Sequence, residues 1–129
     1  MIIGSEAIKY WFPDFPREPN DIDIIGDYIL TIPTERKIER LKNPILEEYY
    51  RGVSKYLPAS PLYTLKISHL FWDVNWEKHM FDVQFLKKKG CIFIPELFNK
   101  YLEANNVANK QKQILSHKFL SIYNKLINK

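Results

Sequence analysis

The most regular pattern in the chain is the alternation of acidic and apolar residues in the stretch Asp21-Ile22-Asp23-Ile24-Ile25. Successive side chains of a β-strand point to opposite faces of the sheet. The pattern therefore predicts a strand at 21–25 with both carboxylates on one face. The apolar start at 1–3 predicts a second short strand, and the turn signal Gly26-Asp27 predicts a third strand at 28–32.

Apolar residues at helical spacing dominate the remainder of the chain. Helices are predicted at 5–12, from 33 to about 42, at 44–57, 62–72, 76–89, 95–104 and 108–127, with proline-containing loops at 13–20 and 58–61. The stretch 62–72 also alternates like a strand, and a helix is the favoured interpretation. Gly90 is expected to end the helix that precedes it. The predicted fold class is α+β: a small mixed sheet, with strands near 1–3, 21–25 and 28–32, covered by several helices.

The length and composition favour one folded domain. The chain has 129 residues, of which 46% are apolar and 15% aromatic, so we expect a single domain over 1–129. Five lysines and no acidic residue follow Glu103. We expect 107–129 to contain a C-terminal amphipathic basic helix whose charged face is solvated, in preference to a tail that binds nucleic acid or a membrane surface.

The sequence also bears on the compartment. No apolar run approaches ~20 residues, so no membrane span is expected. The single cysteine, Cys91, has no partner for an internal disulfide, and the first residues lack the pattern of a secretion signal. These features predict a cytoplasmic protein.

Two groups of residues near the start of the chain suit phosphate and metal chemistry. Asp21 and Asp23 on one strand face would lie roughly 7 Å apart, a distance that one or two divalent cations can bridge. Gly4 permits a close approach to the backbone, and Ser5 is the expected N-cap of the first helix. The amino end of a helix attracts phosphate. A phosphate-binding turn beside a carboxylate pair is the basic equipment for phosphoryl or nucleotidyl transfer.

The order of these motifs resembles the nucleotidyltransferase superfamily (polymerase-beta-like), especially its minimal and abortive-infection-type branches. Gly4-Ser5, a short helix and Asp21-Ile22-Asp23 carry the resemblance, and Arg17-x-Pro19-x-Asp21-x-Asp23 is similar to the R-x-S-x-D-x-D pattern of those branches. Later in the chain, Leu65-Lys66 and Lys78-His79-Met80-Phe81-Asp82-Val83 look like the helical lysine and the basic-x-x-x-Asp-apolar pattern found there. The resemblance covers roughly residues 1–90. The spacing from Gly4 to Asp21 is longer than usual in that family.

The resemblance implies a function and a set of site residues. A nucleoside triphosphate would bind with Mg²⁺ (or Mn²⁺), and a nucleotidyl group would pass to a protein, an RNA or a small molecule. Metal ligands would be Asp21 and Asp23; triphosphate-binding residues would be Gly4, Ser5 and Arg17; the catalytic set would be Asp21, Asp23, Lys66, His79 and Asp82. We therefore expect Lys66 and at least one of His79 and Asp82 to lie within about 10 Å of the Asp21 and Asp23 carboxylates, one Debye length at moderate salt.

Two alternatives stay open. Active members of this superfamily bring a third carboxylate from a later strand, and no strand with an acidic residue is predicted between Ile32 and Leu62. This favours an inactive fold that serves as a binding or antitoxin-like module. A metal-dependent nucleotide phosphohydrolase would use the same carboxylates, with His69 or His79 as general acid or base.

Overall fold

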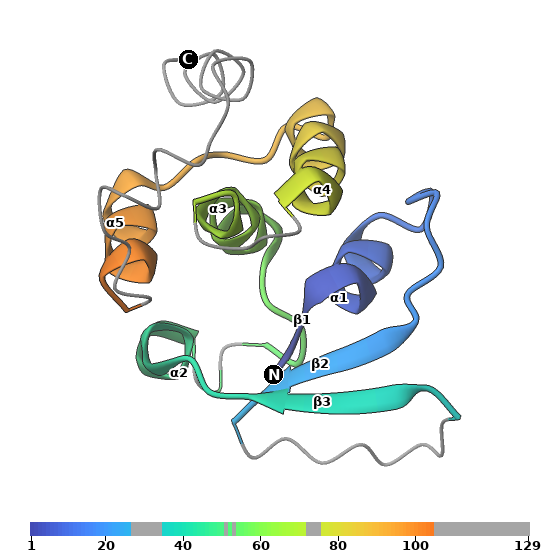
Figure 1. Cartoon of the computed structure of the whole chain (residues 1–129), viewed down its shortest axis with the longest axis horizontal. Helices are drawn as coiled ribbons and strands as arrows, with labels where there is room; N and C mark the ends of the chain where they lie inside the picture. The colour runs from blue at the N-terminus through green and yellow to red at the C-terminus, as the bar shows by residue number, and fades with distance from the viewer. Residues whose placement is uncertain (27–34, 51, 53, 72–75, 105–129) are drawn as a thin grey trace. The chain divides into compact units, whose positions relative to one another are not determined.

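A computed structural model describes residues 1–26, 35–50, 52, 54–71 and 76–104 (Figure 1). The chain divides into two compact units, Met1–Leu62 and Tyr63–Lys129. Strands and helices are both present, so the predicted α+β class is confirmed. The expectation of a single domain over 1–129 stays a prediction. No helix in the described ranges combines the length and the apolar character needed to cross a membrane.

The first unit is built on a small mixed sheet. Strand β1 (Ile2–Ile3) pairs antiparallel with β2 (Asp21–Ile25), and β2 pairs parallel with β3 (Lys37–Leu41), in the order β1-β2-β3. The strands predicted at 1–3 and 21–25 are confirmed. The strand that carries Asp21 and Asp23 lies in the middle of the sheet, where each of its edges has a hydrogen-bonding partner.

The third strand corrects the prediction of a helix from 33 to about 42. Residues 37–41 are extended and pair with β2, and the strand predicted at 28–32 lies outside the described residues. The helix prediction rested on the spacing of Ile38 and Leu41, yet both side chains are exposed. Because these residues bury little apolar surface, the hydrogen bonds offered by β2 decide the local structure, which is a tertiary effect that overrides local spacing.

Helix α1 (Gly4–Trp11) covers the sheet next to β1 and β2. Its apolar residues Ala7 and Ile8 are fully buried. On the sheet, Ile2, Ile22 and Ile24 form a buried cluster, with Tyr56 packed against it. This cluster therefore lies on the face of β2 opposite to the two aspartates.

The helix predicted at 44–57 is shorter in the structure. Helix α2 runs over Pro44–Tyr50, and the Asn43 side chain accepts a hydrogen bond from the Leu46 amide near its start. Further on, the Lys55 carbonyl accepts from the Ile2 amide, and the Leu57 amide donates to the Ile2 carbonyl. The end of the predicted helix is thus extended chain beside β1. Residues 51 and 53 lie outside the described set.

The described part of the second unit is helical. Helix α3 (Ala59–His69) starts in the last residues of the first unit, and α4 (Trp76–Lys88) and α5 (Pro95–Ala104) follow. The predicted helices at 62–72, 76–89 and 95–104 are confirmed in type. However, α3 starts earlier than predicted, so 59–61 form its first turn and not a loop. Gly90, with a φ of 85°, follows α4 as expected. The basic helix predicted within 107–129 lies outside the described residues.

Burial explains why the stretch 62–72 was ambiguous in sequence. Almost every residue from Leu62 to Phe71 is buried, including Thr64, Lys66 and Ser68, and only His69 is partly exposed. A helix that is buried on all sides has no polar stripe and hence no clear helical period. Helix α3 is therefore the core of its unit, and its polar residues need partners inside the protein.

Candidate functional site

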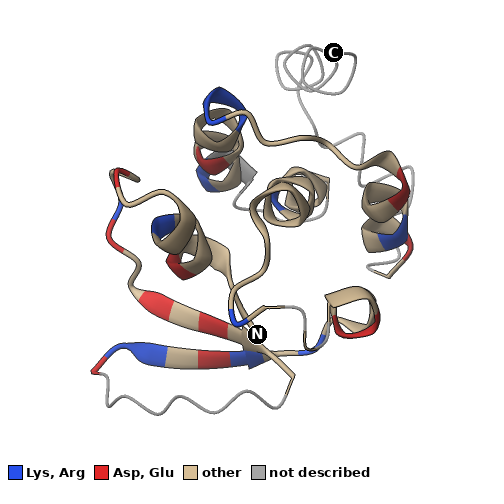
Figure 2. Cartoon of the chain, turned by 180° about the vertical axis from the view of Figure 1, so that it is seen from behind, with Lys and Arg blue, Asp and Glu red and all other residues tan. Residues whose placement is uncertain are grey.

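Strand β2 separates its two faces as the alternation predicts. Ile22 and Ile24 are buried, whereas Asp21 is exposed and Asp23 half-buried. In the register with β3, Asp21 is paired with Lys37 and Asp23 with Glu39. Paired residues of neighbouring strands point to the same side of a sheet. Asp21, Asp23, Lys37 and Glu39 therefore share one face, which we call the charged face; Figure 2 shows the charged bands on the two strands.

Glu39 is a third carboxylate that the sequence analysis missed. The expectation that no strand between Ile32 and Leu62 carries an acidic residue is wrong, because β3 lies there and Glu39 stands beside Asp23. A signal was present in the sequence. The stretch Lys37-Ile38-Glu39-Arg40-Leu41 repeats the order charged, Ile, acidic, variable, apolar of residues 21–25. The apparent helical spacing of Ile38 and Leu41 concealed it.

Lys37 balances charge on this face. Its Nζ lies 3.1 Å from Glu39 Oε1. The hydrogen bond to Glu39, with the charges of Glu39 and Asp21, raises the pKa of Lys37. Carboxylate oxygens on adjacent strands are the donors that Mg²⁺ prefers. In the described ranges, however, no three His, Cys, Asp or Glu side chains are grouped closely enough to hold a metal ion. The donor chemistry fits a divalent cation, but one Glu39 oxygen is paired with Lys37.

Gly4 lies directly against the Asp23 carboxylate. A Cβ atom built at Gly4 would stand 2.6 Å from Asp23 Oδ2, and the Gly4 φ is +71°. Both the space and the backbone conformation thus favour glycine. The close approach that the sequence predicted at Gly4 is made here by a carboxylate of the protein. Its negative charge at the amino end of α1 is favourable, because backbone N–H groups give that end a partial positive charge.

Ser5 and Arg17 are brought together as part of the same group. Ser5 is not the N-cap: Ile3 occupies that position and makes no side-chain capping bond, and Ser5 lies in the first turn. The Ser5 Oγ accepts a hydrogen bond of 3.1 Å from Arg17 Nη2. The Arg17 guanidinium lies over the Phe15 ring, 5.4 Å from its centre. The loop after α1 therefore folds back and delivers a cation to the start of the helix.

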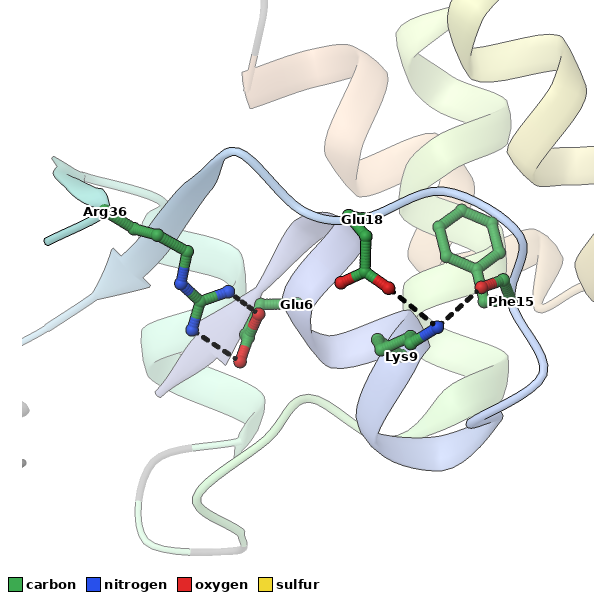
Figure 3. Close-up of polar contacts among 5 residues, drawn as sticks. All are labelled: Glu6, Lys9, Phe15, Glu18 and Arg36. Atoms are coloured by element: carbon green, nitrogen blue, oxygen red, sulfur yellow. Dashed lines mark hydrogen bonds and ion pairs between the residues drawn. The ribbon is translucent and has the colours of Figure 1, made fainter. Parts of the chain in front are cut away.

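A second feature missed in the sequence is an ion pair between α1 and the residue preceding β3. Arg36 donates two hydrogen bonds to the Glu6 carboxylate, from Nη1 to Oε2 and, at 3.1 Å, from Nη2 to Oε1 (Figure 3). The bonds to Glu6 raise the pKa of Arg36. Glu6 and Arg36 are thirty residues apart, so no local pattern indicates the pair.

In the second unit, three other predicted site residues converge with one another. Lys66 Nζ lies 3.1 Å from Asp82 Oδ2 and 3.5 Å from His79 Nδ1. The His69 and His79 rings are 4.5 Å apart between centres. We call these four residues the buried polar cluster. An ammonium group only donates, so the His79 Nδ1 facing it accepts and the proton of a neutral ring lies on Nε2.

The burial of this cluster bears on its role. The side chains of Lys66 and Asp82 are 7% and 0% exposed, and His79 is 8% exposed. Their charges are compensated within the unit. The predicted approach of Lys66, His79 or Asp82 to the aspartates of β2 involves both units and stays a prediction.

Cys91 is a poor candidate for a nucleophile. The thiol is half-buried, and burial raises its pKa to about 11. Only the thiolate is a strong nucleophile, and little of it exists at neutral pH with such a pKa. The candidate site therefore rests on carboxylates and cations.

Comparison with known proteins identifies a family. Neither the curated proteins nor the solved structures contain a match to this chain. One family model, described as a domain of unknown function (DUF7277), matches residues 1–121. Because that match spans nearly the whole sequence, the chain belongs to the DUF7277 family.

Proposed function

We propose that the charged face of the first unit binds a nucleoside triphosphate with Mg²⁺ and supports nucleotidyl transfer to an acceptor. The observation that carries the proposal is the register of β2 and β3, which brings Glu39 beside Asp23 on the face that also presents Asp21. Active members of the superfamily bring a third carboxylate from a later strand, and Glu39 on β3 is a carboxylate in such a position.

The residues around this face have distinct tasks in the proposal. Asp21, Asp23 and Glu39 would hold Mg²⁺, which supplies charge neutralisation at the phosphates when bound. The Arg17 guanidinium is suited to bind phosphate oxygens in two-point contacts, and it already lies beside Ser5. Gly4 leaves room at the helix start for the Asp23 carboxylate, one of the proposed metal ligands. Lys37, released from Glu39, provides a second cation for the triphosphate.

The buried polar cluster gives little support to the catalytic roles that the resemblance implies for its residues. The resemblance places Lys66 in the catalytic set, but its ammonium is bound to Asp82 in a site with little exposure. This contact favours a structural role for Lys66 and Asp82. The catalytic assignments of Lys66, His79 and Asp82 stay proposals that need both units to converge.

A second candidate function is an inactive nucleotidyltransferase-like fold that acts as a binding module. The Lys37–Glu39 ion pair favours it, because a lysine already balances the carboxylates at the position proposed for the metal. A nucleotide phosphohydrolase is the third candidate and would use the same charged face with water as the acceptor.

Calorimetry with Mn²⁺ tests the proposal. We expect Asp21→Asn together with Asp23→Asn to abolish Mn²⁺ binding without unfolding the protein, and Glu39→Gln to weaken it. Glu48→Gln, which changes an exposed carboxylate of the same unit, is the matched control and should bind as wild type does. Failure of the wild-type protein to bind Mn²⁺, or unchanged affinity in the double variant, contradicts the proposal.

Product analysis by mass spectrometry then separates the three functions. The full chain is incubated with each nucleoside triphosphate and Mg²⁺ in the presence of protein, RNA or small-molecule acceptors. Pyrophosphate release with a labelled acceptor supports transfer. Orthophosphate or nucleoside indicates hydrolysis, and binding without turnover indicates the module.

A further inference from the structure

Strand β3 carries Glu39 but is weakly held by apolar contacts. No residue of the strand is buried, and Ile38 and Leu41 are 39% and 42% exposed. The burial of apolar surface is the main favourable term in packing, so little of it fixes this strand. Backbone pairing with β2 provides hydrogen bonds, but such bonds form in more than one register.

The pairing register of β3 with β2 nevertheless determines which side chains lie on the charged face. Side chains of a strand alternate between faces, so a slip of one residue moves every side chain to the opposite face. A slip of β3 would carry Glu39 away from Asp23 and place Ile38 or Arg40 on the charged face. Strands exposed on both faces specify their register weakly, and β3 is such a strand. Its register therefore needs a further determinant.

The contact between Glu6 and Arg36 has the position and geometry of that determinant. Arg36 directly precedes β3, and Glu6 lies in the first turn of α1, which is packed on β1 and β2 through the buried Ala7 and Ile8. The guanidinium meets the carboxylate in a two-point contact, which fixes orientation as well as distance (Figure 3). Glu6 and Arg36 side chains are only 20% and 38% exposed, so water screens them less than a fully exposed pair.

We infer that Glu6 and Arg36 are a positioning pair: they tie the start of β3 to α1 and thereby hold Glu39 beside Asp23 on the charged face. The consequence for metal binding rests on the proposed function, whereas the consequence for strand register does not. Their two hydrogen bonds join α1 to the residue before β3 and include no member of the charged face, so the effect of this contact on a ligand is indirect.

The same helix offers a matched control. Lys9 and Glu18 also form an ion pair, at 3.5 Å, but Glu18 is 85% exposed (Figure 3). It ties α1 to the loop before β2, and Glu18 acts on Arg36 only through its charge, as the smallest of the causes that raise the pKa of Arg36. Removing it should leave the register of β3 unchanged.

The test measures strand order and metal affinity in the full-length protein. The variants are Glu6→Gln, Arg36→Gln, Arg36→Lys, the exchange Glu6→Arg with Arg36→Glu, and the control Glu18→Gln. Circular dichroism establishes that each is folded, and Arg36→Lys, which keeps the charge but not the two-point contact, serves if Arg36→Gln does not fold. Backbone amide exchange of 37–41 by NMR reports the pairing of β3, and calorimetry reports Mn²⁺ affinity.

We expect the amides of β3 to exchange at least about tenfold faster in Glu6→Gln and Arg36→Gln, and Mn²⁺ affinity to fall by about tenfold, as when outer residues that orient metal ligands are changed. Arg36→Lys should lie between these variants and wild type, the exchange should recover part of both losses, and Glu18→Gln should match wild type.

Different outcomes separate the inference from the proposed function. Unchanged exchange at 37–41 in both Gln variants overturns the positioning role. Faster exchange with unchanged Mn²⁺ affinity overturns the link between the pair and the metal ligands. Faster exchange in a protein whose wild type binds no Mn²⁺ supports the positioning of β3 and contradicts the proposed function.

Discussion

A lysine–carboxylate pair with the same N–O separation occurs in the described part of each unit. Lys37 Nζ lies 3.1 Å from Glu39 in the first unit, and Lys66 Nζ lies 3.1 Å from Asp82 in the second. Their surroundings differ. The first two side chains are 71% and 38% exposed, and the second two are 7% and 0% exposed. Two pairs with the same N–O distance therefore differ in how far solvent reaches them.

Solvent explains the difference. Water and salt weaken an exposed pair, which is readily exchanged for another partner. A buried pair has lost its hydration, so each charge depends on the other, and loss of one partner leaves the second without compensation. The charges of Lys37 and Glu39 thus stay in contact with solvent, whereas those of Lys66 and Asp82 depend on each other inside the protein. This is why the proposed site is assigned to the charged face.

The largest effect is expected from breaking the buried pair. Asp82→Asn keeps the shape of the side chain but removes the charge opposite Lys66, so we expect the free energy of unfolding to fall by about 3–5 kcal/mol. Urea unfolding followed by circular dichroism measures it.

A compensated variant checks the cause of that loss. Lys66→Met with Asp82→Leu removes both charges and should recover most of the stability, because apolar replacement of a whole buried pair is often neutral or stabilising. A loss below about 1 kcal/mol in Asp82→Asn would contradict the view that this pair is structural.

An intermediate effect is expected from Gly4→Ala. The left-handed conformation costs a residue with a Cβ roughly 1–2 kcal/mol, and the new methyl group would also press on Asp23 Oδ2. Gly90→Ala, at a φ of +85° with no atom within 4 Å of the built Cβ, carries the conformational cost alone. We expect urea unfolding to show a larger loss at Gly4.

The excess at Gly4 isolates the contact with the carboxylate. Adding Asp23→Ala to Gly4→Ala should remove that excess, since the two changes are coupled only through this contact. Equal losses at Gly4 and Gly90 would show that Asp23 moves aside without cost.

The smallest effect is expected from Lys37→Gln. Because Lys37 is exposed and water already screens its ion pair, the midpoint of urea unfolding should be indistinguishable from that of wild type. A destabilisation comparable with that of Asp82→Asn would remove the distinction between the two pairs.

Local pattern was sufficient for part of the fold and of the site. The alternation in 21–25 predicted both the strand and the shared face of Asp21 and Asp23, because the side-chain period of a strand is a property of the backbone. The amphipathic helix at 95–104 and the glycine that follows α4 were predicted for the same kind of reason. The grouping of Gly4, Ser5 and Arg17 followed from the order of known motifs.

Tertiary structure alone decided the remainder. Residues 37–41 became a strand because β2 offered hydrogen bonds to a segment with little apolar surface to bury, and this placed Glu39 beside Asp23. The Glu6–Arg36 contact joins residues thirty apart, and the exposure of Lys37 and burial of Lys66 depend on what packs around each. The sequence by itself determined which residues repeat at strand or helix spacing, since that depends on backbone geometry. Which charges are buried with a partner and which stay exposed to solvent depends on long-range packing, because burial sets the strength of an ion pair.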